Sequence, residues 1–209
     1  MIRLITSDNR SAYPSLVQAM HADRKRVFVD MLRWNIAHDE CQERDEFDDE
    51  FAEYLILHDP STGEHLASMR LLRTDRPHLL SSAFAHLCDK GVPSSCDIFE
   101  ITRFCVAPRG RAADRRAARN RLVRAMVEYA LLTDIRAFTA VCNMRFLSEV
   151  LSAGWRCRPL GLPMVEQGEL VGALMIEIDT ATLGSLIGPW RCDPVDLRLV
   201  GRMHRALAA

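Results

Sequence analysis

The sequence predicts an α/β fold in which a mixed, mostly antiparallel sheet is sandwiched by helices. Two observations lead to this prediction. First, the 209 residues are 48% apolar and 26% charged, which is the mixture of a globular protein that buries a full core without disulfides or a metal. Second, segments with strand-like alternation follow segments with helical spacing along most of the chain. We expect a single domain over residues 1–209.

In the first part of the chain, apolar residues at helical spacing predict an amphipathic helix over residues 11–30. Residues 31–50 are acidic and lose this periodicity, which indicates a loop. Residues 52–58 and 65–73 are apolar and flank the turn signal Asp-Pro-Ser-Thr-Gly at 59–63. We therefore expect a β-hairpin over these residues.

From residue 74 onward the pattern alternates between helix and strand. The run 112–132 is strongly helical, whereas residues 98–106 alternate as a strand does. We expect strands over residues 98–106, 137–142, 155–160 and 171–178, a short helix around Phe84–Cys88, and helices over residues 112–132, 144–152, 180–188 and 194–207.

Charge and cysteine usage exclude several classes of protein. A formal net charge of −1 argues against a surface tuned as a whole for nucleic acid. The seven cysteines include no Cys-x-x-Cys pair, so we expect reduced thiols and a cytoplasmic location. No apolar run has the length of a membrane span. The histidines form no ligand cluster along the sequence, and we expect no metal.

Nearly all of the positive charge is arginine, since Lys25 and Lys90 are the only lysines. GC-rich coding bias is the simpler explanation. A need for guanidinium groups that grip carboxylates is the alternative.

The first motif with chemical content is Glu43-x-Asp45-x-x-Asp48. Three carboxylates within six residues repel one another unless cations lie among them. A solvated acidic loop is the alternative, and calcium is disfavoured because the glycine and glutamate of an EF-hand loop are missing. We expect Asp45 or Asp48 to pair with Arg24 or Arg70.

Charges also occur inside strand patterns, at Arg70, Glu100 and Arg103. Strand alternation sends Glu100 and Thr102 to one face and Arg103 to the other. Charges among apolar residues are seldom left unpaired, so we expect Glu100 to pair with a nearby arginine. A structural ion pair that only orders the sheet is the alternative.

These residues belong to a longer ordered set. It comprises Arg24, Phe28, Trp34, Glu43, Asp45, Asp48, Arg70, Phe84, Glu100, Thr102, Arg103 and Phe104. The set resembles the signature of the acyl-homoserine-lactone synthases, the LuxI-type autoinducer synthases, and the resemblance runs from about residue 20 to residue 178. Thr102 departs from it, since many relatives carry serine there, but the hydroxyl is kept.

The resemblance implies a fold similar to that of the GNAT N-acetyltransferases. It implies a transfer of an acyl group from acyl-carrier protein or acyl-CoA to the amine of S-adenosylmethionine. Lactone closure then releases methylthioadenosine. Both compounds are substrates, so no cofactor is expected. The product is a quorum-sensing signal that a lactone-responsive transcription regulator reads. The N-terminal half would hold the S-adenosylmethionine site and the C-terminal half the acyl-chain pocket.

The amine must lose a proton before it attacks. We assign the base to Glu43, with Glu100 as the second candidate. Asp45 and Asp48 complete the catalytic set as an acidic wall for the cationic substrate. The expected S-adenosylmethionine-binding residues are Arg24, Phe28, Trp34, Arg70, Thr102 and Arg103, because arginine suits the carboxylate and aromatic faces suit the adenine or the sulfonium.

The junction at 106–110 lies where acetyltransferases hold a pyrophosphate between strand and helix, although the second glycine of their motif is missing. Seven arginines follow between Arg109 and Arg124, against one acid, Asp114. A solvated helix face is one explanation, and a dock for coenzyme A phosphates or for an acidic carrier protein is the other. The expected docking residues are Arg109, Arg111, Arg115, Arg116 and Arg119.

The C-terminal half is expected to build the acyl pocket, although ordinary core is the alternative for each residue. In the family, a threonine on the strand before the following helix goes with 3-oxo donors. Cys142 is the best match here, with Thr139 and Ala140 close by, so we expect a donor without a 3-oxo group. The expected pocket residues are Phe84, Thr139, Cys142, Met144, Phe146, Leu147 and Trp155.

Two other functions stay open. One is a GNAT-like acyl-CoA N-acyltransferase that acts on another amine, and the other is a degenerate module that only binds carrier protein. An ordinary acetyltransferase has no counterpart of the acidic loop, and a degenerate binder has no reason to keep the charged residues. These residues are intact at Glu43, Asp45, Asp48, Arg70, Glu100 and Arg103.

Overall fold

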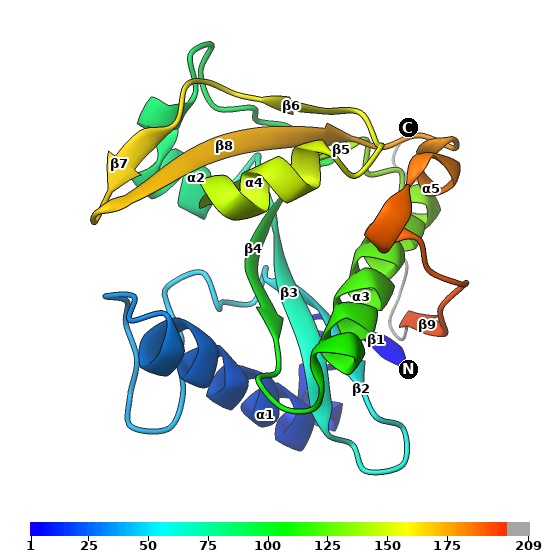
Figure 1. Cartoon of the computed structure of the whole chain (residues 1–209). Coiled ribbons are helices and arrows are strands. Elements are labelled where there is room, and N and C mark those ends of the chain that lie inside the picture. The colour runs from blue at the N-terminus through cyan, green and yellow to red at the C-terminus, as the bar shows by residue number, and fades with distance from the viewer. Residues whose placement is uncertain (200–209) are drawn as a thin grey trace. The chain divides into compact units, whose positions relative to one another are not determined.

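The computed structural model describes residues 1–199 (Figure 1). Its strands pair in a mixed and mostly antiparallel manner. Among the registers of these residues, only two pairs are parallel: β1 (Ile2–Ile5) with β9 (Leu197–Leu199), and β4 (Ile98–Val106) with β5 (Ala137–Asn143). Helices accompany the strands, so the predicted α/β class is confirmed. The chain divides into two compact units. The expectation of a single domain over residues 1–209 stays a prediction.

The first unit contains residues 1–71, 103–126 and the described part of 192–209. Its sheet is antiparallel except at the β9 edge, where β9 runs parallel to β1. The strand order is β3 (His65–Arg73), β2 (Glu53–His58), β1 (Ile2–Ile5) and β9 (Leu197–Leu199). The hairpin predicted from residues 52–58 and 65–73 is confirmed, and the Asp59 carboxylate accepts the backbone N–H of Ser61 in its turn.

Two helical segments lead into the candidate site of this unit. A 3-10 turn, η1 (Arg10–Ala12), precedes α1 (Pro14–Arg24), which begins with proline at its first helical position. The chain then continues as a π-helix, η2 (Lys25–Met31), which carries the buried Phe28. π-helical turns are rare and are frequent at functional sites.

The second unit contains residues 72–102 and 127–191. In its sheet, β8 (Glu169–Glu177) pairs antiparallel with β5 (Ala137–Asn143), β6 (Cys157–Pro159) and β7 (Met164–Glu166). β5 pairs parallel with β4 (Ile98–Val106). Its helical segments are α2 (Leu79–Ala83), η3 (Ala85–Leu87), α4 (Met144–Leu151), α5 (Thr182–Ser185) and η4 (Gly188–Trp190).

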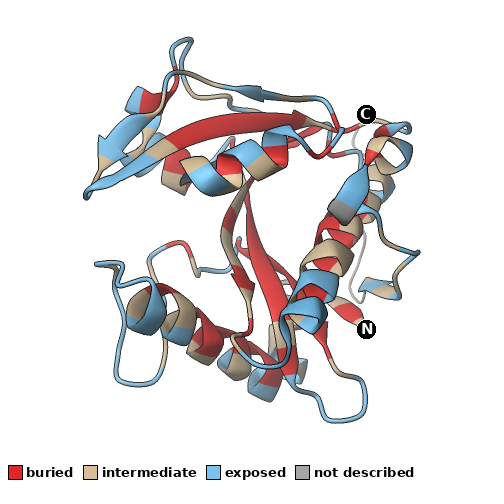
Figure 2. Cartoon of the chain, in the orientation of Figure 1, coloured by how far each residue is buried: buried red, intermediate tan, exposed pale blue. Residues whose placement is uncertain are grey.

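Three elements continue from one unit into the other along the chain: β3, β4 and the long helix α3 (Ala112–Leu132). Figure 2 shows that β3 and β8 are buried along most of their length. None of the helices within residues 1–199 combines the length and the apolar character that crossing a membrane requires.

Most predicted elements are found, and the departures involve short segments. The first strand and β7 were not predicted. The helix expected around Phe84–Cys88 is divided into α2 and η3, both of which end before Cys88. The helix expected over 194–207 is wrong at residues 197–199, which form β9 because pairing with β1 decides so short a segment. Residues 200–207 of that helix lie outside the described residues.

Candidate active site

Three arginines and three carboxylates form one ion-pair network in the first unit. The arginines come from the end of α1, from β3 and from β4, and the carboxylates all come from the loop between η2 and β2. Opposite charges in equal number leave the network formally neutral. Its members, called the arginine–carboxylate cluster below, are Arg24, Glu43, Asp45, Asp48, Arg70 and Arg103.

Arg24 joins the two ends of the carboxylate motif. Its Nε donates to Glu43 Oε2 at 2.5 Å. Its two terminal nitrogens donate to the two oxygens of Asp48 at 2.8 and 2.9 Å, a bidentate geometry that fixes both groups. The Glu43 side chain is 0% exposed, so this part of the cluster is closed to solvent.

Arg70 and Arg103 share Asp45. Arg70 forks its carboxylate, with the Nη2–Oδ2 contact at 3.0 Å, and Arg103 Nη2 donates to the same Oδ2 at 2.7 Å. Arg103 Nε also donates to Glu43 Oε1 at 3.0 Å. The expected pairing of Asp45 and Asp48 with Arg70 and Arg24 is therefore confirmed. The Arg103 and Asp45 side chains, 8% and 7% exposed, are the members of the cluster nearest to solvent.

The backbone of Arg103 is left-handed, with φ of 50°. That conformation is uncommon for a residue other than glycine, and it interrupts the regular alternation of β4 on which the predicted face of Arg103 rested. Strained backbone of this kind is held in place at functional sites. Here the guanidinium is anchored by two carboxylates of the cluster.

Burial alone would raise the pKa values of Asp45 and Asp48. The hydrogen bonds and charge of Arg24 hold the pKa of Asp48 far below its usual range, and Arg70 does the same for Asp45. Both carboxylates stay ionised at neutral pH and are weak bases. The assignment of the base to Glu43, with Glu100 as the second candidate, stays a prediction.

Three further residues support the cluster. The Tyr54 hydroxyl donates to Asp48 Oδ1 at 2.7 Å, and the Phe47 ring lies 5.7 Å from the Arg70 guanidinium carbon. Buried His21 donates its Nδ1–H to the Glu43 carbonyl at 2.9 Å, and the Glu43 N–H donates to the His21 carbonyl at 3.2 Å. The local sequence gives no signal for His21 or Tyr54, whereas Phe47 lies inside the acidic motif.

His21 makes the stability of this loop dependent on pH. Burial, followed by the charge of Arg24, lowers its pKa to about 4. The unfolded chain therefore binds a proton between about pH 6.5 and pH 4 that the folded chain excludes. We expect the free energy of unfolding to fall by about 3 kcal/mol as the pH drops through this window.

Urea unfolding between pH 4 and pH 7 measures this effect, and His21→Asn should flatten the profile while keeping an N–H donor. The matched control is His38→Asn, because His38 is exposed and its variant should keep the wild-type slope. An unchanged slope in His21→Asn would assign the pH dependence to other groups.

Phe28 and Trp34 stack face to face, with ring centroids 4.9 Å apart and planes 9° apart. Phe28 is buried and lies 5.9 Å from the Arg103 guanidinium carbon. Trp34 is 36% exposed. The aromatic pair therefore extends from the cluster to the surface, and its proposed contact with adenine or sulfonium stays a prediction.

The other two predicted residues of β4 belong to the second unit. Glu100 is fully buried, and its Oε1 accepts the backbone N–H of Leu80 in the first turn of α2 at 2.9 Å. Thr102 is also buried. Glu100 therefore ties β4 to the helix that leads to Phe84. Its expected pairing with an arginine stays a prediction.

The predicted acyl-pocket residues divide between two faces of the sheet in the second unit. Phe84 and Val141 both pack against a buried cluster that includes Ala173. Thr139, two positions before Val141, shares that face. Cys142 pairs with Gly172, which lies under Leu147 of α4 on the opposite face. Phe146 and Trp155 both lie against Trp190, and Met144 begins α4.

Thr139 and Cys142 differ in their polar character. The Thr139 hydroxyl is buried without a hydrogen-bond partner among residues 1–199. Burial, followed by the charge of Cys157, raises the pKa of the Cys142 thiol to about 12. Cys142 is therefore a neutral thiol at neutral pH and behaves as a small apolar side chain.

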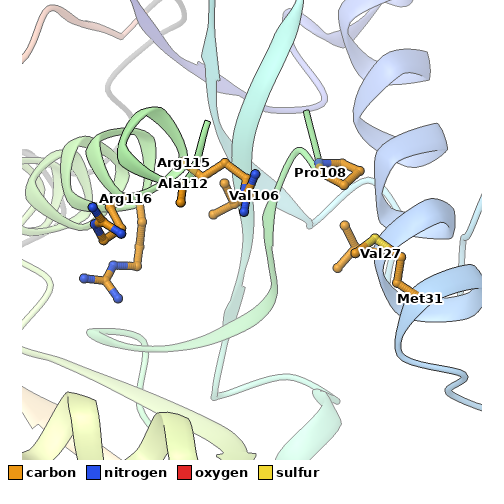
Figure 3. A pocket seen from close by; sticks show the side chains of 8 residues that line it. Val27, Met31, Val106, Pro108, Ala112, Arg115 and Arg116 are labelled. Atoms are coloured by element: carbon orange, nitrogen blue, oxygen red, sulfur yellow. The ribbon is translucent and has the colours of Figure 1, made fainter. Parts of the chain in front are cut away.

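A pocket of about 400 Å³ lies at the turn between β4 and α3 (Figure 3). η2 and the end of β4 contribute apolar side chains to its lining, and α3 contributes the basic ones. The lining residues are Val27, Met31, Val106, Pro108, Ala112, Arg115, Arg116 and Arg119. Three of the five predicted docking arginines are thus brought together.

The other two predicted docking residues do not line this pocket. Arg109 makes ion pairs with Asp23 and Glu64. Arg111 is 86% exposed and pairs with Asp114. Among residues 1–199, no three His, Cys, Asp or Glu side chains gather so that they could hold a metal ion.

Comparison with known proteins links this geometry to one family. The profile of the family described as "Autoinducer synthase" matches residues 8–186. An acyl-homoserine-lactone synthase from Rhizobium etli is 32% identical over 173 residues, 81% of each chain. The isovaleryl-homoserine lactone synthase of Bradyrhizobium diazoefficiens is 30% identical over 192 residues, 89% of this chain and 84% of the relative.

Solved structures of acyl-homoserine lactone synthases are also similar to this chain. The CoA-dependent acyl-homoserine lactone synthase BjaI, solved with SAM and isopentyl-CoA, superposes with a TM-score of 0.85 at 27% identity, covering 97% of this chain and 94% of BjaI. An acyl-CoA N-acyltransferase from Pseudomonas aeruginosa superposes with a TM-score of 0.57 at 13% identity, covering 84% of this chain and 98% of that one. At this low identity the N-acyltransferase shows a shared fold alone. The shared fold agrees with the predicted likeness to N-acetyltransferases.

Proposed function

This chain belongs to the autoinducer synthase family, a family of acyltransferases that make acyl-homoserine lactones, and from that premise we propose that it acylates S-adenosylmethionine with a coenzyme A thioester. In the first step the α-amine attacks the thioester carbonyl. An amide bond forms, the carbon–sulfur bond of the thioester breaks, and the thiolate leaves and takes up a proton.

In the second step the methionyl carboxylate attacks the carbon next to the sulfonium. A carbon–oxygen bond closes the lactone, and the carbon–sulfur bond breaks with its electron pair going to sulfur. Methylthioadenosine leaves as a neutral thioether. The chain must therefore bind one cationic amino acid, remove one proton and hold one thioester.

The observation that carries this proposal is the arginine–carboxylate cluster. Its carboxylates offer hydrogen-bond acceptors for the substrate ammonium, and its most exposed arginine, Arg103, offers a charged donor for the substrate carboxylate. Arg103 and Asp45 are the members nearest to solvent. We therefore place the substrate ammonium against Asp45 and the substrate carboxylate against Arg103. Trp34, as the exposed member of the aromatic stack, then serves the adenine or the sulfonium.

For the donor we propose acyl-CoA, with acyl-carrier protein as the alternative that the test decides. The pocket at the β4–α3 turn combines an apolar floor with Arg115, Arg116 and Arg119. Such a pocket suits a phosphopantetheine arm with phosphates at its rim. The protein BjaI is described as CoA-dependent, which also supports this choice. The neutral thiol of Cys142 favours a donor without a 3-oxo group.

The test is an assay of the purified protein with S-adenosylmethionine and a series of acyl-CoA thioesters. Mass spectrometry should detect the acyl-homoserine lactone and methylthioadenosine in equal amounts. In the same assay with other amines added, a stable acyl amide of one of them, without methylthioadenosine, would support the rival N-acyltransferase. Product from acyl-carrier protein alone would overturn the proposed donor.

We further propose that a lactone-responsive transcription regulator reads the product, which a reporter strain carrying such a regulator would test.

The triple variant Arg115→Glu, Arg116→Glu and Arg119→Glu tests the donor pocket. Charge reversal should raise KM for acyl-CoA by about tenfold or more, because it replaces attraction for the phosphates by repulsion. KM for S-adenosylmethionine should stay within about twofold. The wild-type KM for acyl-CoA should also rise with salt.

Arg145→Glu is the control for this variant, because Arg145 is an exposed arginine on α4 outside the pocket. It should leave both KM values unchanged. If the triple variant also leaves KM for acyl-CoA unchanged, the arginines form only a solvated helix face.

A further inference from the structure

Asp23 has no role in the reaction derived above, yet its side chain is only 1% exposed. It lies on α1 directly before Arg24 and accepts hydrogen bonds from three other residues. Arg26 donates at 2.9 Å, His65 Nδ1 at 2.7 Å, and the two terminal nitrogens of Arg109 at 2.6 and 2.7 Å. A buried carboxylate with this set of partners joins three segments of the first unit.

The charge of Asp23 is maintained by these partners. Burial alone would raise its pKa, but the hydrogen bonds from His65 and Arg109 hold that pKa well below its usual range. An ionised carboxylate at this depth is strongly destabilising once its partners are removed. The Asp23–Arg109 pair is therefore a fixed contact of the fold.

All three guanidinium nitrogens of Arg109 donate hydrogen bonds within the fold. Besides the fork on Asp23, Nε donates to Glu64 at 2.6 Å and Nη2 donates to the His65 carbonyl at 2.9 Å. This side chain has no free fork for a phosphate. What it fixes instead is the backbone that carries it, the turn between β4 and α3.

That turn forms part of the pocket wall. Pro108, on one side of Arg109, lines the pocket, and so does Ala112 at the start of α3. Gly110 takes the left-handed conformation between them, with φ of 74°, and its carbonyl accepts a hydrogen bond from Arg115 at 2.8 Å. Arg109 and Arg115 thus hold the turn at neighbouring residues.

We propose that Asp23 is a positioning residue for the acyl donor, which acts by locking Arg109 and thereby pre-forming the β4–α3 turn that lines the donor pocket. This inference rests on the proposed function, since it takes the pocket to be the donor site. A turn that is already ordered loses little conformational freedom when the donor binds, so the lock strengthens donor binding without touching the donor. S-adenosylmethionine, which is bound elsewhere in the unit, gains nothing from it.

Calorimetric titration of the purified protein with coenzyme A and, separately, with S-adenosylmethionine tests this. Arg109→Gln removes the ion pair with Asp23. It should leave the fold intact, because the Arg109 side chain is 38% exposed and Asp23 keeps its hydrogen bonds from Arg26 and His65. We expect its Kd for coenzyme A to rise by about tenfold, with the Kd for S-adenosylmethionine within about twofold. In turnover, KM for acyl-CoA should rise while kcat changes little.

Arg26→Gln is the matched control, because it removes another arginine partner of Asp23 without touching the turn. Both Kd values should stay at the wild-type level. Asp23→Asn should reproduce the effect of Arg109→Gln, and the double variant should be no weaker than either, since both remove the same contact. If Asp23→Asn does not fold, the Kd of Arg109→Gln for coenzyme A alone tests the positioning role.

The outcomes separate this inference from the proposed function. A wild-type protein that binds neither coenzyme A nor S-adenosylmethionine would overturn both. A wild-type protein that binds both, together with an Arg109→Gln variant whose Kd for coenzyme A is unchanged, would overturn the positioning role alone. An equal rise in the Kd values for coenzyme A and S-adenosylmethionine in Arg109→Gln would also overturn the positioning role, because such a rise would show a general structural role.

Discussion

Replacing Asp48 by alanine should lower the free energy of unfolding by about 3–5 kcal/mol and abolish lactone formation. Asp48 accepts hydrogen bonds from both terminal nitrogens of Arg24 and from the Tyr54 hydroxyl, and Arg70 lies 2.9 Å from the same carboxylate. The variant leaves two buried guanidinium groups with one carboxylate fewer. Denaturant unfolding followed by tryptophan fluorescence measures the loss.

Glu50→Ala is the control, since Glu50 is an exposed acid of the same loop and should change the free energy of unfolding by less than about 0.5 kcal/mol.

The effect of Asp48 on stability also has a defined pH dependence. Because the pKa of Asp48 is depressed in the folded chain, its stabilisation is complete above the unfolded pKa of about 4 and is lost as the pH falls further. The difference between wild type and variant should shrink below that pH. A stable Asp48→Ala protein with full lactone yield would contradict the structural role of the cluster.

Long periodic segments of the fold could be predicted from the sequence, because their patterns are specific. The strand over residues 98–106 and the helix over residues 112–132 have the predicted bounds. β7 and β9 have three residues each, too few to show a period, and their pairing partners decide their conformation. Short strands of this kind require the tertiary structure.

The candidate site could be predicted in composition but not in its connections. Three carboxylates within six residues need cations among them, and this argument correctly predicted that Asp45 and Asp48 pair with arginines. The role of Arg109 could not be predicted in the same way. In the sequence it begins an arginine-rich run, whereas in the structure its partner is Asp23, 86 residues away. Nothing in the local pattern distinguishes Asp23 from an exposed helical acid.

Replacing Glu43 by glutamine should lower kcat by about 10²–10⁴, the usual contribution of a general base. At neutral pH most of the substrate amine is protonated, since an α-amino group has a pKa near 8. Glu43 is buried, and its two oxygens accept hydrogen bonds from Arg24 and Arg103. We therefore expect a remaining lone pair to take the amine proton only when the substrate is bound against Arg103. Binding of S-adenosylmethionine should stay within a few-fold, and the rate should partly recover at high pH, where the free amine is plentiful.

Two comparison variants separate proton abstraction from loss of charge. Asp45→Asn removes a carboxylate from Arg70 and Arg103 in the same cluster, and its loss of rate should not recover at high pH, because Asp45 is held ionised and is a weak base. Glu100→Gln keeps an oxygen that can accept the Leu80 N–H and should keep most of its rate. If Glu43→Gln keeps its rate while Glu100→Gln loses it with recovery at high pH, Glu100 is the base. If both keep their rates, water or the substrate itself takes the proton, and the carboxylates of the cluster serve only to hold the arginines and the substrate cation.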